Sequence, residues 1–148
     1  MPHFGLMDEY KMEPHEAALM RARLHIRSGM RRLRQGMLKE GLFTLYDSLY
    51  SGMRFYILSP ENKDRFDGAE GIQRTEEMAL YKLLRNAGAV DSSFDFDSFF
   101  DLMEKLIDGV DVEINSAEAL KGYDKIMTQL GVMPFDESAL PPENPKTP

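Results

Sequence analysis

Apolar residues recur at steps of three and four along most of the chain, the spacing that places them on one face of an α-helix. Pro14 suits the first turn of the earliest such stretch, because its missing N–H costs nothing there. Gly36 marks the predicted end of this first helix. Its apolar positions are Leu19, Ala22, Ile26, Met30, Leu33 and Met37.

A second helix is predicted from Met37 to Leu58, and its apolar face is wide. A helix that is apolar over so much of its surface is usually the central, most buried one. The main stripe consists of Leu38, Leu42, Leu45, Leu49, Met53 and Tyr56, and the residues that widen it are Phe43, Tyr46, Tyr50 and Ile57. Small residues would let a neighbouring helix come close, and these are Gly41, Ser48 and Gly52.

Three further helices complete the predicted core. The third begins with Thr75 as its N-cap and stops near Gly88. The fifth starts at Asn115, which has capping-box spacing to Glu118, and ends at Gly131. The fourth opens near Asp95 and has an acidic outer face; its core residues are Phe96, Phe99, Phe100, Met103, Leu106, Ile107 and Val110. The inward residues of the fifth are Leu120, Tyr123, Met127 and Leu130.

These elements divide the chain into an N-terminal arm over residues 1–13, a helical bundle domain over 14–131 and a Pro-rich tail over 132–148. The tail has little to bury and is predicted to be extended or disordered. Residues 59–74 are predicted to form a long charged loop. The pattern as a whole predicts an all-α, single-domain, up-and-down bundle of about five helices.

Composition removes most catalytic classes from consideration. The chain has no cysteine, which excludes disulfides and thiolate metal sites and suits a cytoplasmic protein. It has no apolar run near the roughly 18 residues that a membrane span needs, and no signal-peptide pattern at its N-terminus. Metal-binding Glu-x-x-His and His-Glu-x-x-His spacings, nucleophile elbows and phosphate-binding loops are missing from the sequence. We therefore assign no catalytic residue, metal or cofactor, and favour a protein that is not an enzyme.

The distribution of charge singles out the first helix. The stretch from Leu19 to Lys39 carries only basic charges, in a chain whose net charge is −7. Four arginines share one helical face, namely Arg23, Arg27, Arg31 and Arg34. They could pair with the acidic fourth helix of this chain or of a second copy, lie in solvent, or bind an anion through guanidinium–phosphate contacts. The negative total charge would repel a long polyanion.

A narrow polar stripe on the second helix also needs an explanation. Asp47 and Arg54 lie two helical turns apart on the same side of an otherwise apolar surface. Charges in such a place need partners. They could pair with other helices or with a symmetry mate, or they could contact a ligand in a pocket.

The first helices resemble the opening of HEPN-type helical bundles. The resemblance rests on Gly36–Leu42, on the tyrosines and small residues of Leu45–Met53, and on Glu77–Ser93, and it covers residues 15 to 130. Ribonucleases of that family carry an arginine followed, a few residues later, by a histidine. Arg85 begins such a motif here, but no histidine follows it. The resemblance therefore implies a non-catalytic relative, a class that dimerises and binds nucleotides or partner proteins.

The sequence thus favours a non-enzymatic bundle that acts by homodimerisation or by binding a partner protein. The second helix and part of the fourth would form the interface, since both have more apolar surface than one core stripe needs. The alternative is nucleotide or RNA binding through the arginine face of the first helix. An enzyme would need a pocket that uses Asp47, Arg54, Tyr46 or Tyr50.

Overall fold

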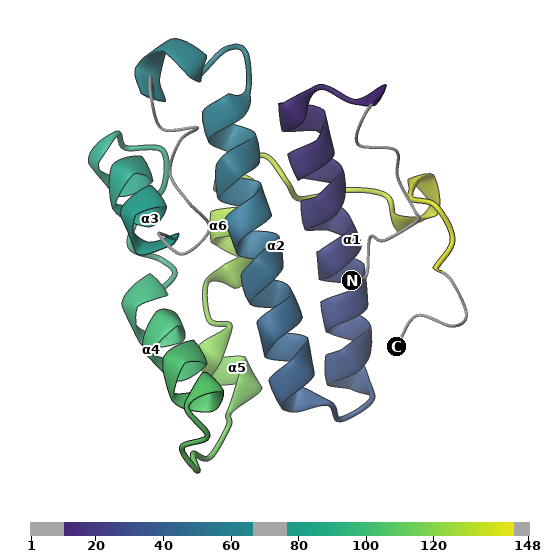
Figure 1. Ribbon diagram of the computed structural model, residues 1–148, viewed down its shortest axis with the longest axis vertical. Helices are drawn as coiled ribbons and strands as arrows, with labels where there is room; N and C mark the ends of the chain where they lie inside the picture. Colours follow the sequence, from purple (N-terminus) through teal and green to yellow (C-terminus); the bar gives the residue numbers. More distant parts are fainter. Residues whose placement is uncertain (1–10, 67–76, 144–148) are drawn as a thin grey trace.

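A computed structural model describes residues 11–66 and 77–143 and consists of helices joined by turns (Figure 1). The α-helices are α1 (Pro14–Arg34), α2 (Leu38–Leu58), α3 (Glu77–Asn86), α4 (Phe96–Ile107), α5 (Ser116–Ala119) and α6 (Tyr123–Gln129), and the 3₁₀ turns are η2 (Lys63–Phe66) and η5 (Glu137–Ala139). No strand occurs in these two described ranges. The prediction of an all-α bundle is confirmed.

Helices α1 and α2 form a tightly packed antiparallel pair. Gly36, with a φ of 80°, ends α1 and turns the chain. A Cβ on Gly41 would lie 2.6 Å from a methyl carbon of Leu33 and 3.2 Å from the carbonyl oxygen of Gly29. At Gly52, eleven residues further along α2, an added Cβ would lie 3.1 Å from a side-chain carbon of Val132. The small residues of α2 therefore allow close approach by neighbours, as predicted.

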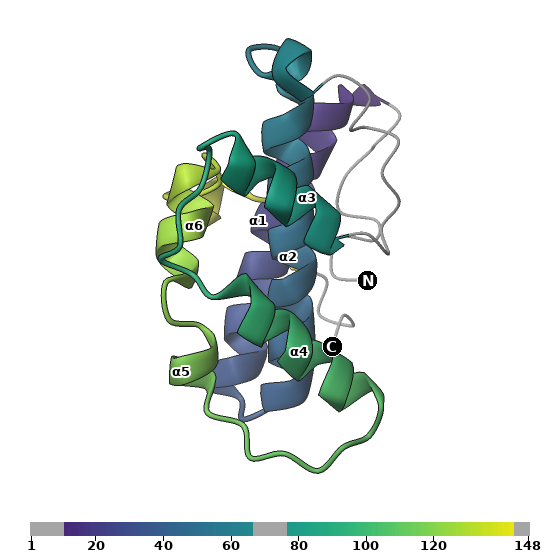
Figure 2. The same ribbon diagram turned by 90° about the vertical axis from the view of Figure 1, so that its left-hand side faces the viewer.

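Helix α2 is the centre of the molecule. It lies between α1 on one side and the short helices α3 and α4 on the other, and α5 and α6 cover it from a third direction (Figures 1 and 2). Its core positions are fully buried and include Leu42, Leu45, Leu49 and Met53. The wide apolar face of α2 is thus largely covered by helices of the same chain.

Helix α4 confirms its predicted start but not the whole of its predicted core face. The Asp95 side chain accepts a hydrogen bond from the Ser98 backbone N–H at 3.0 Å and caps the helix. Ile107 and Val110, predicted to be buried, are 71% and 49% exposed. The helix ends at Ile107, and Gly109, with a φ of 74°, carries the chain away from the core. The residues of the predicted face that are buried are Phe96, Phe99, Met103 and Leu106.

The predicted fifth helix is two helices. Asn115 caps α5 by accepting a hydrogen bond from the Glu118 N–H at 3.1 Å, as expected from the spacing. Gly122 then interrupts the helix with a φ of 83°. A Cβ at this position would lie 2.1 Å from the carbonyl oxygen of Ser93. The prediction of one continuous helix is wrong because the chain bends here to pass beside that backbone.

Part of the tail also differs from expectation. Val132 is completely buried and Leu140 is 9% exposed, so residues 132–143 pack against the bundle. The prediction that the tail buries little is wrong over this range, because proline prevents helix formation without preventing burial. In the predicted 59–74 loop, Phe66 is buried against the Tyr56 ring. The predicted N-cap Thr75 and most of the predicted arm lie outside the described residues.

Candidate binding site

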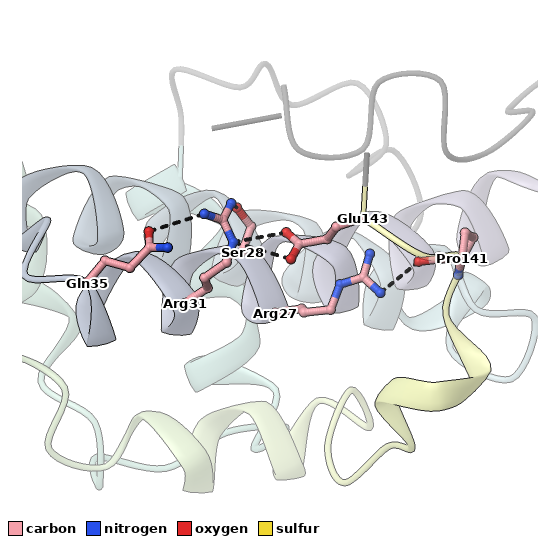
Figure 3. A network of polar contacts seen from close by, with 6 residues as sticks. All are labelled: Arg27, Ser28, Arg31, Gln35, Pro141 and Glu143. Atoms are coloured by element: carbon pink, nitrogen blue, oxygen red, sulfur yellow. Dashed lines mark hydrogen bonds and ion pairs between the residues drawn. The ribbon is translucent and has the colours of Figure 1, made fainter. Parts of the chain in front are cut away.

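Residues 132–143 cover part of the basic face of α1. We call Arg23, Arg27 and Arg31 the arginine row and residues 132–143 the C-terminal segment. Arg23 Nε donates a hydrogen bond to the Val132 carbonyl at 3.0 Å, and Arg27 Nη1 donates one to the Pro141 carbonyl at 2.7 Å. Arg31 Nε lies 3.2 Å from a carboxylate oxygen of Glu143 (Figure 3). Three arginines at four-residue spacing therefore bind one stretch of chain.

The guanidinium groups of the row are held from more than one side. Arg31 also donates to the side chains of Gln35 at 3.2 Å and Ser28 at 3.4 Å (Figure 3). The Arg23 guanidinium lies over the Phe135 ring, 5.4 Å from its centroid, and burial lowers its pKa from the ordinary value. The buried Arg27 Nε has no hydrogen-bond partner among the described residues. The row is thus partly desolvated, and within it Arg31 is also held by neighbouring residues of α1 and its C-cap.

The acidic fourth helix of the same chain does not cover these arginines, so of the alternatives considered above this one does not hold. Helix α4 packs on the opposite side of α2 from α1 (Figure 1). Asp97, Asp101 and Glu104 are exposed there, and Asp101 pairs with Lys105 of its own helix at 3.0 Å. Arg34, the fourth arginine of the predicted face, lies exposed at the end of α1 and does not join the row's contacts with the segment.

A pocket of about 580 Å³ opens where the start of α1, the end of α2 and the C-terminal segment meet. We call it the acidic-rimmed pocket. Its main apolar lining residues are Met12, Leu19, Met20, Phe55, Phe135 and Leu140. Three carboxylates also line it, from α1, from the turn after α2 and from the C-terminal segment, namely Glu16, Glu61 and Asp136, together with His15 and Arg23. The three carboxylate residues are exposed.

Hydrogen bonds within the C-terminal segment keep one rim carboxylate, that of Asp136, charged. Asp136 accepts hydrogen bonds from the Ser138 N–H at 3.0 Å and from the Ser138 hydroxyl at 2.7 Å, which lower the pKa of its carboxyl. The carboxylate is therefore ionised at neutral pH. Arg23, the one arginine that lines the pocket, already binds a backbone carbonyl and an aromatic ring. The site suits a ligand with an apolar body and a positive charge.

The polar stripe of α2 belongs to a different place. Arg54 lines a smaller pocket of about 320 Å³ with Tyr50 and with Arg21 of α1. Asp47 is half-buried and is not part of that lining. Both Asp47 and Arg54 have interaction partners, as charges on such a helix require. Tyr46, considered for an enzymatic pocket, packs its ring against aromatic residues of α4 instead.

The structure thus separates the residues singled out by sequence. Arg23 reaches the acidic-rimmed pocket, Arg27 and Arg31 bind the C-terminal segment, and Arg54 lines the second pocket. Sequence reasoning missed the outer wall of the first pocket, which includes Phe135. Two large apolar residues placed among the prolines of the tail were the available signal.

Neither a family model, nor a curated protein, nor a solved structure matches this chain. Within residues 11–66 and 77–143, no three histidine or carboxylate side chains gather as a metal site would require. None of the helices in the same ranges combines the length and apolarity of a membrane span.

Proposed function

We propose that this protein is a non-enzymatic binding module that recognises a partner protein through the acidic-rimmed pocket. The observation that carries the proposal is a mostly apolar pocket of about 580 Å³ whose exposed rim bears three carboxylates. Ligand pockets typically have volumes of about 300–1,000 Å³, apolar walls and a few polar groups that select the ligand. The partner feature that fits is a basic segment with large apolar side chains.

The wall chemistry favours a peptide over a rigid small molecule. Met12 and Met20 line the pocket, and methionine side chains adapt to irregular apolar partners. Amphipathic helices bind such grooves with apolar residues at helical spacing. Around the pocket, a chain with a net charge of −7 attracts basic segments over distances of about 10 Å at moderate salt.

Two other proposals have weaker support. Homodimerisation through α2 and part of α4 was expected from their wide apolar faces, and neighbouring helices of the same chain use most of the face of α2. On α4, Ile107 is 71% exposed. Nucleotide or RNA binding by α1 would require an anion to compete with the C-terminal segment for the arginine row. The HEPN-like resemblance is compatible with a non-catalytic binding role.

The test uses a fluorescent amphipathic peptide of leucine and lysine, about 14 residues or four helical turns long. We expect it to bind the full-length protein in fluorescence anisotropy, and a matched peptide with glutamate for lysine not to bind. Charge reversal at the rim by Glu16→Lys with Glu61→Lys should weaken binding about tenfold, which corresponds to about 1.4 kcal/mol. Asp97→Lys with Glu104→Lys, a double reversal of exposed carboxylates on α4, changes the net charge by the same amount and is the matched control.

Several outcomes would refute the proposal. Equal binding of the lysine and glutamate peptides would show that the rim carboxylates do not select a basic ligand. An equal loss of affinity in the control with Asp97→Lys and Glu104→Lys would show a general charge effect rather than a site. A single-stranded RNA that bound more tightly than the peptide would favour the nucleic-acid alternative, and a dimer in light scattering would favour self-association.

A further inference from the structure

The C-terminal segment both forms the outer wall of the acidic-rimmed pocket and binds the arginine row. The wall consists of Phe135, Asp136, Ala139 and Leu140. On the near side of this wall, the Val132 carbonyl accepts from Arg23. On the far side, Pro141 and Glu143 bind Arg27 and Arg31. The arginine row therefore holds the chain on both sides of the wall, through Arg23 before it and through Arg27 and Arg31 after it.

From this arrangement we infer that Arg27 and Arg31 act as a latch that positions the outer wall of the pocket and thereby sets its affinity for ligand. The arginines are positioning residues in this role, because neither lines the pocket. The effect on affinity rests on the proposed function, whereas the effect on the position of the wall does not.

The wall has few internal means of keeping its shape. Its regular structure is the single 3₁₀ turn η5, which is closed by backbone hydrogen bonds from Ala139 to Asp136 at 3.0 Å and from Leu140 to Glu137 at 3.1 Å. Such short turns have poor hydrogen-bond geometry and need support from their surroundings. The Leu140 side chain is buried, whereas the Phe135 side chain is only half-buried and so is less fixed by packing. Contacts with α1 must supply the remaining order.

The C-terminal segment offers hydrogen-bond acceptors where the latch arginines offer donors. Pro141 and Pro142 have no backbone N–H and cannot donate hydrogen bonds, so the segment offers mainly carbonyl and carboxylate oxygens there. Arginine is a donor without acceptor groups, and its bonds to oxygen are charge-assisted. Arg27 reaches the Pro141 carbonyl at 2.7 Å, and Arg31 faces the Glu143 carboxylate (Figure 3).

The two contacts differ in strength and in sensitivity to salt. The Arg31 and Glu143 side chains are 22% and 28% exposed, so their ion pair is screened by dissolved ions. Arg27 binds a neutral carbonyl and has its Nε buried, so it depends less on ionic strength. Salt should therefore loosen the segment first at Glu143.

Amide hydrogen exchange of Ala139 and Leu140 reports the opening of the η5 hydrogen bonds that hold the wall in its shape, and peptide anisotropy reports affinity. Arg27→Met and Arg31→Met keep much of the side-chain volume and remove the donors. We expect exchange at these amides to become about tenfold faster and the basic peptide to bind more weakly, a tenfold change being about 1.4 kcal/mol. Arg34→Met is the matched control, since it removes the same charge from the same helix beyond the segment.

A charge exchange separates a specific latch from general destabilisation. Arg31→Glu and Glu143→Arg should each accelerate exchange at Leu140, and the double variant should restore slow exchange. Leu49 in the core of α2 serves as the reference amide for global unfolding.

Unchanged exchange at Ala139 and Leu140 in Arg27→Met and Arg31→Met, or equal acceleration in Arg34→Met, would overturn the latch. Faster exchange without loss of peptide affinity would overturn its influence on the pocket. If the wild-type protein binds no basic peptide, the proposed function fails, and the exchange comparison still decides whether the latch exists.

Discussion

Removing the Tyr123 hydroxyl and removing the Ser48 hydroxyl should destabilise the fold by different amounts, although each breaks the same hydrogen bond. Both side chains are buried, and their hydroxyls are bonded to each other where α6 packs against α2. Ser48 Oγ also lies 2.5 Å from the Leu45 carbonyl, to which it donates. Ser48 therefore accepts from Tyr123, which donates its only proton to that oxygen.

The order of the two effects follows from what each substitution leaves behind. Tyr123→Phe leaves the Ser48 hydroxyl bonded to Leu45, so the loss is that of one net hydrogen bond, about 1 kcal/mol. Ser48→Ala leaves the tyrosine hydroxyl buried without an acceptor, which costs about 1–3 kcal/mol. The double variant removes both polar groups and should be more stable than Ser48→Ala alone, a strong departure from additivity.

Urea unfolding at pH 7 of the wild type, both single variants and the double variant provides the four free energies. The comparison is valid when the four proteins share one m-value, because then only stability has changed. The reasoning is refuted if Tyr123→Phe costs as much as Ser48→Ala, or if the two losses simply add. Either result would mean that the tyrosine hydroxyl has another acceptor or reaches water.

Three further predictions test the fold and its ionisable groups. Burial raises the pKa of Tyr123 above its ordinary value of about 10, so its stabilising contribution is complete below pH 10 and is lost as pH rises further. In Tyr123→Phe, the free energy of unfolding, measured in urea at several pH values, should therefore fall less steeply above pH 10 than in the wild type. Hydrogen bonds from Ser93 lower the pKa of Asp91 to about 2, so this carboxylate stabilises the fold above its ordinary pKa and the contribution is lost as pH falls toward 2; an NMR titration of Ser93→Ala should show a higher midpoint. Gly122→Ala should cost more than the roughly 1–3 kcal/mol of left-handed strain alone, because its Cβ meets a backbone oxygen, whereas Gly109→Ala has the same sign of φ and open space; thermal unfolding that ranks the two equally would contradict this.

Local features of the sequence were sufficient to predict most of the helices. The three-and-four spacing of apolar residues located α1 and α2, and the capping side chains Asp95 and Asn115 marked the starts of α4 and α5. Each of these signals acts over a few residues along the chain. For that reason the residue spacing that predicts each helix or cap is also the spacing at which those residues meet in the fold.

The errors came from contacts between distant parts of the chain. Gly122 interrupts an apolar period that continues on both sides of it, and its conformation depends on the backbone of Ser93. Ile107 continues the period of α4 but has no neighbouring element to cover it, so it is 71% exposed. In the tail, prolines exclude a helix, yet Val132 and Leu140 pack against the bundle. Periodicity cannot reveal the partner that decides burial.

The arginine row shows that a count of charges does not identify the partner of a basic face. The acidic helix α4 was one candidate, but guanidinium groups need oxygen acceptors rather than net negative charge, and two of the acceptors here are backbone carbonyls. Those carbonyls neutralise no charge, but they hold Arg23 and Arg27 against the C-terminal segment, and only Arg23 of the row also lines the pocket. The carboxylates of Glu16 and Glu61 remain exposed at the acidic-rimmed pocket. A chain with a net charge of −7 therefore presents to a partner a face more acidic than its composition alone indicates, and this argues for a basic partner.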